Sequence, residues 1–139
     1  MGYTNYWQQS EKFTDEEFKK IEDHTQGVVK KSILDDKIWI EFTRSISYWP
    51  EGEKYIPYIK INGNSDLGQD HESFIFENKI SDFEFCKTNR KPYDWVVWFV
   101  LLIAHEIAPS KISIKNDDGE SMGTWLNSKD FENKVVWKN

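Results

Sequence analysis

Residues 85–104 of the chain read FCKTNRKPYDWVVWFVLLIA, and the interpretation of the whole sequence starts from this stretch. Its second half, Val96 to Ala104, is apolar at every position, which predicts a helix that is buried on most of its sides. Pro92 suits the first position of that helix, because the amide hydrogen that proline lacks would have no helical partner there. Asp94 then falls in the first turn, where the helix dipole favours a negative side chain.

The basic segment before this helix is the candidate site. Backbone N–H groups without partners at a helix start are suited to bind anions, and arginine offers a fork-shaped donor for phosphate. A solvated basic loop that merely precedes a core helix is the structural alternative. The predicted ligand-binding residues of this segment are Lys87, Thr88, Asn89, Arg90 and Lys91.

Residues 2–7 are rich in β-formers and predict a first strand. Side chains alternate along a strand, so Tyr3 and Asn5 should face one side, and Thr4 and Tyr6 the other. If this strand lies beside the start of the apolar helix, one of its aromatic rings could stack on a base. The predicted ligand-binding set therefore also contains Tyr3, Thr4, Tyr6 and Trp7.

A second helix is predicted to start after Thr14 and to run to about residue 31. Thr14 is a favourable N-cap, and Glu17 completes a capping box with it. Phe13 and Phe18 occupy the two positions of a hydrophobic staple. One apolar face at helical spacing is formed by Phe18, Ile21, Thr25 and Val28.

The remaining segments read mainly as strands. Residues 38–42, extended by 45–49, and residues 72–76 and 111–115 have strand patterns. Residues 55–61 also read as a strand, in which Pro57 implies an edge position or a bulge. Residues 116–119 signal a hairpin turn with a return strand at 121–125, and residues 130–137 suit either a short helix or a strand. The predicted fold is α+β, a mainly antiparallel sheet with two long helices packed on one face.

Composition limits the class of protein. A chain of 139 residues fits a single domain, residues 1–139. The net charge of −6 argues against general nucleic-acid binding, which favours a basic face. The single cysteine excludes an intramolecular disulfide, which fits a reducing, cytoplasmic setting. We expect no signal peptide and no membrane association, because the start is polar and residues 95–104 are too few to span a bilayer.

Catalytic and metal chemistry have little support in the sequence. Cys86 would need a nearby base, and His71 is the one plausible histidine, but no pattern places the two together. The acidic residues between 64 and 72 match no calcium loop. The sequence leaves enzyme activity open but favours binding, and it predicts no catalytic residue, no metal and no cofactor.

Two motifs carry a resemblance. Residues 1–7, MGYTNYW, and residues 85–94, FCKTNRKPYD, resemble a family of small bacteriophage proteins of uncharacterised function. Those proteins typically begin Met-Gly-Tyr-Thr-His-Tyr and carry Phe-Cys-Lys-Thr-Ala-Arg-Lys-Pro-Tyr-Asp before an apolar helix. Asn5 stands here where the family usually has histidine, so this position cannot act as an acid or base. The resemblance implies an infected bacterial host as the setting and assigns no catalytic residue.

Two functions follow as expectations. The first is capture of a phosphate-bearing, nucleotide-type small molecule, such as a nucleotide immune signal of the host. The alternative is a phage inhibitor that binds a host protein through an aromatic, acidic surface. A ligand binder should have a concave pocket at the start of the apolar helix, whereas a protein inhibitor should expose an aromatic patch. Either one is compatible with a homo-oligomer.

Overall fold

The structure, a computed structural model, describes residues 2–35, 40–49 and 54–119, and the predicted α+β class is confirmed. The predicted strand at 121–125 and the segment at 130–137 lie outside the described residues. The elements are β1 Thr4–Gln9, α1 Asp15–Asp35, β2 Ile40–Trp49, β3 Lys54–Gly63, the short 3-10 helix η2 Ser65–Leu67, β4 Phe74–Glu77, β5 Ser81–Lys87, α2 Asp94–Ile107 and β6 Ile112–Asn116.

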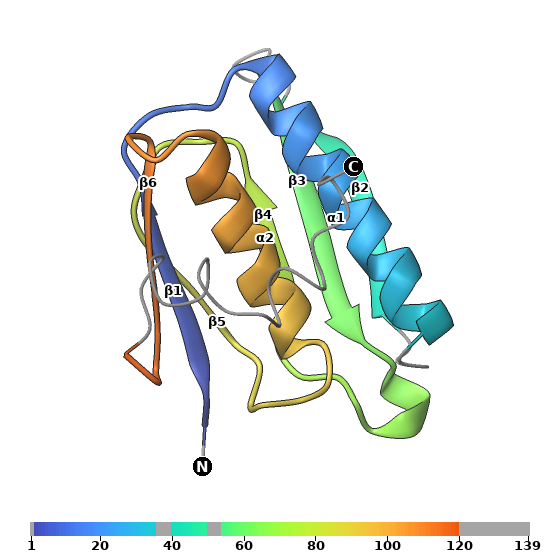
Figure 1. The fold of residues 1–139 in the computed structure, drawn as a ribbon. Coiled ribbons are helices and arrows are strands. Elements are labelled where there is room, and N and C mark those ends of the chain that lie inside the picture. Colours follow the sequence, from blue (N-terminus) through green and yellow to red (C-terminus); the bar gives the residue numbers. More distant parts are fainter. Residues whose placement is uncertain (1, 36–39, 50–53, 120–139) are drawn as a thin grey trace.

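The strands form two three-stranded antiparallel sheets, in the orders β5–β1–β6 and β2–β3–β4. The two sheets contribute to one core, in which the Trp7 ring of β1 contacts Phe74 and Phe76 of β4. Both helices lie on the same side of the strands (Figure 1). The prediction of antiparallel strands with two helices on one face therefore holds, but the strands are divided between two sheets.

Helix α2 is the centre of the core. Its residues 96–104 are all buried, with at most 2% of any side chain exposed, as their unbroken apolar sequence predicts. Helix α1 packs beside it and buries the predicted face that contains Phe18, Ile21 and Val28. The capping box is also present: the Thr14 N–H donates to Glu17 Oε1 at 2.8 Å, and the Glu17 N–H donates to Thr14 Oγ1 at 3.1 Å.

The start of α2 differs from the prediction. The helix begins at Asp94, two residues after Pro92. Pro92 instead follows Lys91 in a turn that is closed by the Asp94 N–H donating to the Lys91 carbonyl at 2.9 Å. Proline favours the second position of such a turn because its ring fixes φ near the required value. Pro92 therefore lies close to the start of the helix, as predicted, but in the turn that leads into it and not at its first position.

Pro57 lies within β3, the middle strand of its sheet. The last pair between β3 and β4 joins Tyr58 with Glu77, so Pro57 lies just beyond the end of β4. On that side its carbonyl accepts a hydrogen bond from the Asn78 N–H at 2.9 Å. The missing N–H of a strand proline does least harm where no neighbouring strand continues. The predicted edge position or bulge is therefore wrong, since β3 is the central strand and pairs with β2 without a register shift, and Pro57 is accommodated because β4 ends before it.

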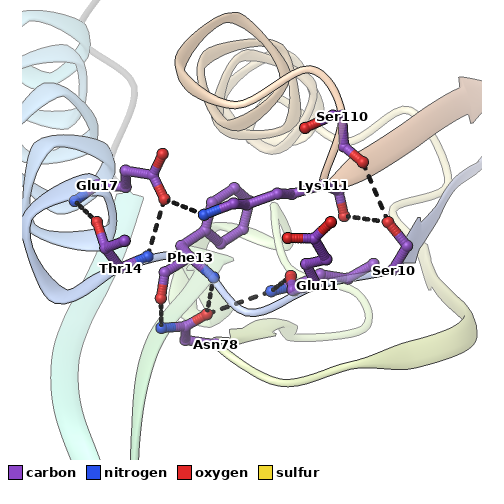
Figure 2. A network of polar contacts seen from close by, with 9 residues as sticks. Ser10, Glu11, Phe13, Thr14, Glu17, Asn78, Ser110 and Lys111 are labelled. Carbon is purple, nitrogen blue, oxygen red and sulfur yellow. Dashed lines mark hydrogen bonds and ion pairs between the residues drawn. The ribbon is translucent and has the colours of Figure 1, made fainter.

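Asn78 connects the turn after β4 to the segment before α1 (Figure 2). Its Oδ1 accepts the Phe13 N–H at 2.8 Å and a hydrogen bond from Gln9 at 3.2 Å, and its Nδ2 donates to the Phe13 carbonyl at 2.9 Å. Nearby, Lys111 forms an ion pair with Glu17 at 2.6 Å, which joins the start of α1 to the start of β6. These contacts hold together segments that are distant in the sequence.

Asn78→Ala should destabilise the fold strongly. The substitution leaves the buried N–H and C=O of Phe13 without a side-chain partner, which should cost about 2–4 kcal/mol of unfolding free energy. Urea denaturation measures the change. Lys79→Ala is the matched control, because it removes only a surface ion pair with Glu77, worth about 0–1 kcal/mol. Equal effects of the two substitutions would contradict the role of Asn78.

Candidate functional site

The basic segment between β5 and α2 lies directly beside the first strand. The N–H groups of Thr88 and Asn89 both donate to the carbonyl of Tyr3, at 2.9 and 3.2 Å. The chain then turns through two residues with positive φ, 54° at Asn89 and 56° at Arg90. Asparagine adopts this left-handed region more readily than most residues. The first strand therefore lies beside the segment that leads into the helix, which is the arrangement that the stacking hypothesis required.

Asp94 is the polar centre of this corner. Its Oδ1 accepts hydrogen bonds from the Thr88 hydroxyl at 2.5 Å and from the Asn5 amide at 2.8 Å. Burial raises the pKa of the Asp94 carboxyl, and these two hydrogen bonds oppose the rise. The N–H groups of Val96 and Val97 donate to the carbonyl of residue 93. The start of α2 is thus occupied by groups of the protein itself.

Arg90 has a carboxylate partner in the turn after β6. Its guanidinium forms an ion pair with Asp118 at 2.8 Å and lies 4.0 Å above the centre of the Tyr3 ring. The Tyr3 hydroxyl donates to the same carboxylate at 2.9 Å. The hydrogen bond from Arg90, followed by that from Tyr3, lowers the pKa of Asp118. Arg90 thus pairs with a carboxylate that lies 28 residues further along the chain.

The other predicted residues have varied surroundings. Lys91 donates to the Gly68 carbonyl at 3.0 Å, and the Thr4 N–H donates to the Asp117 carboxylate at 2.8 Å. Trp7 lies in the core and is 4% exposed. Of the nine predicted residues, those gathered at the corner around Arg90 and Asp94 are Tyr3, Thr4, Thr88, Asn89, Arg90 and Lys91. Tyr6 and Lys87 instead belong to the outer surface of the sheet.

The outer surface of the β5–β1–β6 sheet carries exposed aromatic side chains. Phe83 is 58% exposed and Phe85 is 54% exposed, and Tyr6 of the neighbouring strand is half-buried between solvent and these rings. The ring centre of Phe83 lies 5.9 Å from the ring centre of Tyr6 and 5.9 Å from that of Phe85. We call Tyr6, Phe83 and Phe85 the outer aromatic face. The alternating order Phe83-Glu84-Phe85 was the sequence signal that could have revealed it.

A hollow of about 380 Å³ adjoins the outer aromatic face. Tyr6 and Phe83 line it together with Gln8, Ser113 and Lys115, and its floor includes Trp7 and Ile114. This volume lies within the range that small-molecule sites occupy, and the mixture of rings with a few polar groups is typical of them. Lys87 and Lys115 are exposed on the strands that flank β1. The structure thus places a hollow, aromatic rings and two cations on one surface.

Cys86 faces the opposite side of β5 and is 1% exposed. Burial, with a smaller contribution from Glu72 and Asp94, raises the pKa of its thiol to about 12. The thiol is therefore protonated at neutral pH, which does not suit a nucleophile. Within the described residues, no group of three His, Cys, Asp or Glu side chains could hold a metal ion.

Comparisons with protein-family profiles, with curated proteins and with solved structures found no match to this chain. In the described part of the chain, no helix is long and apolar enough to cross a membrane. The function must therefore be argued from the geometry of the site.

The thiol of Cys86 should resist alkylation while the protein is folded. At pH 8 a pKa of about 12 leaves almost no thiolate, and burial denies access to the reagent. Mass spectrometry after treatment with iodoacetamide should find the native chain unmodified and the urea-unfolded chain modified once. Rapid modification of the native chain would show that the thiol is accessible and activated.

Asp94→Asn should change how stability depends on pH. The raised pKa means that folded Asp94 holds its proton more tightly than the unfolded chain does. Its ionisation therefore lowers the unfolding free energy as pH rises from about 4 through the raised pKa. Urea unfolding between pH 4 and 7 should show the variant gaining stability relative to the wild type as pH rises.

Asp118→Asn is the matched control with the opposite sign. The pKa of Asp118 is lowered, so its stabilising effect exists above the ordinary aspartate pKa and is lost as pH falls. This variant should therefore lose stability relative to the wild type as pH rises to about 4, and the difference between the two should stay constant from pH 4 to 7. Parallel pH profiles for the wild type and Asp94→Asn would contradict the assigned environment of Asp94.

Proposed function

We propose that this chain binds a nucleotide-type ligand on the outer surface of the β5–β1–β6 sheet. The observation that carries the proposal is the combination of the outer aromatic face with the adjoining hollow of about 380 Å³. An aromatic ring that is half exposed on a rigid strand offers its flat surface to a base at little cost in conformational entropy. Stacking between bases and such rings contributes about 1–3 kcal/mol per base.

The lysines on the same surface supply the complement to phosphate. Lys87 lies two residues after Phe85 on β5 and is directly paired with Thr4 of β1. Lys115 is paired with Tyr6 from the other side and lines the hollow. A ligand whose base stacks on these rings would have Lys87 on one side and Lys115 on the other, and either lysine would attract its phosphate. The proposed phosphate contact therefore lies on the sheet surface, whereas the sequence predicted it at the start of α2.

Arg90 then has a supporting role. Its charge is matched by Asp118, and its guanidinium covers the Tyr3 ring, so it stabilises the corner between β1 and the turn after β6. Asp117 in that turn accepts a hydrogen bond from the Tyr6 hydroxyl at 2.7 Å. The corner thereby fixes the position of one ring of the outer aromatic face. This arrangement favours binding over turnover, because the side chains at the hollow provide no activated nucleophile.

In the phage setting that the resemblance implies, the role would be sequestration of a nucleotide immune signal in the cytoplasm of the infected host. A rigid sheet surface with aromatic and cationic groups can retain a ligand without changing it. The proposed activity therefore depends on the amount of protein and on affinity, rather than on a catalytic rate.

A second candidate function is binding of a host protein through the same surface. The exposure of Phe83 and Phe85 favours it, because an exposed aromatic patch is the feature that was expected of a protein inhibitor. The hollow lies on the sheet and not at the start of α2, where the pocket of a ligand binder was expected. Lys115 and the other polar side chains that line the hollow favour the nucleotide-type ligand instead. The two candidates differ in whether a small base-bearing ligand binds to the purified protein.

Phe83→Ala should weaken binding of the ligand while leaving the fold intact. Loss of one stacking surface should cost about 1–3 kcal/mol of binding free energy. Calorimetric titration of linear and cyclic nucleotides into the wild type and the variant measures this loss. Leu67→Ala is the matched control, because Leu67 is equally exposed, at 58%, but lies in η2 away from the sheet surface.

Two results would contradict the proposed function. One is a wild-type protein that binds no base-bearing ligand at millimolar concentration. The other is binding that Phe83→Ala and Leu67→Ala change equally. In either case, loss of a host-protein interaction in Phe83→Ala would support the second candidate.

A further inference from the structure

We infer that the ligand of the outer aromatic face is a single-stranded oligonucleotide segment of two to three nucleotides. This inference rests on the proposed function and specifies its ligand. It starts from the number of rings: Tyr6, Phe83 and Phe85 each present a surface on which one base can stack. A mononucleotide would use only one of these surfaces.

The position of the rings in the sheet supports this ligand. Tyr6 lies on β1 directly opposite Phe85 on β5, and Phe83 lies two residues earlier on the same side of β5. Helix α2 packs on the other face of this sheet, which buries Trp7 and Cys86, and the alternate residues Tyr6, Phe83 and Phe85 therefore face away from the helices (Figure 1). RNA-recognition motifs bind two or three unpaired bases through aromatic side chains on a sheet in this way. This chain shares with them only the physical arrangement, in which aromatic rings lie on two neighbouring strands.

The charges of the surface favour single strands over duplexes. The chain has a net charge of −6, which opposes binding driven mainly by phosphate contacts. Two lysines, Lys87 and Lys115, flank the rings, and the neighbouring carboxylate of Asp117 already accepts hydrogen bonds from Tyr6 and Thr4. Stacking must then supply most of the affinity. Bases of a duplex are paired and stacked on each other, so they cannot use these rings.

Fluorescence anisotropy and calorimetry with the full chain would test the inference. The probes are single-stranded RNA and DNA of one, two, three and six nucleotides, and a duplex of the same sequence. Affinity should rise by about 5-fold or more for each added nucleotide up to three, since each further base adds a stacking contact. It should rise little beyond three nucleotides, and the duplex should bind at least 10-fold more weakly than the six-nucleotide strand.

Variants identify the surface. Phe85→Ala should lower the affinity for the three-nucleotide probe by about 5- to 150-fold, the range that corresponds to loss of one stacked base. Leu67→Ala should leave affinity unchanged. Because about half of the Phe85 side chain is already in solvent, Phe85→Ala should remain folded, which circular dichroism checks.

Salt dependence gives an independent readout. With Lys87 and Lys115 as the two phosphate contacts, the logarithm of affinity should fall with the logarithm of salt concentration with a slope of about −1.4. Lys87→Ala should reduce that slope by about half. A slope several times steeper would show that many phosphate contacts dominate, which overturns the stacking inference.

The outcomes separate this inference from the proposed function. If a mononucleotide binds as tightly as the three-nucleotide probe, the oligonucleotide inference is wrong and the proposed function stands. The same holds if the duplex binds as tightly as the single strand. If no base-bearing probe binds, both are wrong. If oligonucleotides bind but Phe85→Ala has no effect, the outer aromatic face is not their site.

Discussion

Burial of α2 along nine consecutive residues is the constraint on which the rest of the structure depends. A helix that is apolar on all sides must be covered on all sides, and α1 together with the inner faces of both sheets provides the cover. The helices therefore gather on one side of the strands, and the outer surface of the β5–β1–β6 sheet is left to carry polar and aromatic groups in solvent. The location of the candidate site is in this sense a consequence of how the core helix is buried.

The start of that helix shows how a basic segment can serve the fold. Asp94 begins α2 and is bound by side chains from β1 and from the preceding turn, Asn5 and Thr88. Arg90 adds a second connection to Asp118. Together these contacts tie β1, α2 and the end of β6 at one corner, and that corner positions Tyr6 through Asp117.

Features that depend on local sequence were predicted well, and features that depend on distant pairing were not. The capping box at Thr14 and the buried face of α1 follow from spacings of three and four residues, which any helix imposes. The division into two sheets depends on which strands pair, and no short-range pattern records that choice. The pairing of Arg90 with Asp118 spans 28 residues and requires β6 to lie beside β1, so no short-range sequence pattern could reveal it. The predicted site was accordingly split, with Tyr6 and Lys87 on the sheet surface and most of the others at the corner.

The two faces of β5 and β1 explain how an acidic chain can present a surface suited to the proposed base-bearing ligand. Alternation sends Cys86 and Trp7 into the core and Phe85 and Tyr6 into solvent. Apolar rings that stay in water on the outer face have an unfavourable hydration free energy, which a ligand that covers them would remove. Because the rings are flat, bases stack on them better than irregularly shaped apolar groups do. The acidic residues of the chain limit long-range attraction of phosphate, so selectivity must come from close stacking and from the two lysines beside it. Under the proposed function, this surface would select a ligand by whether its bases are unpaired, which depends on the form of the nucleic acid and not on its total charge.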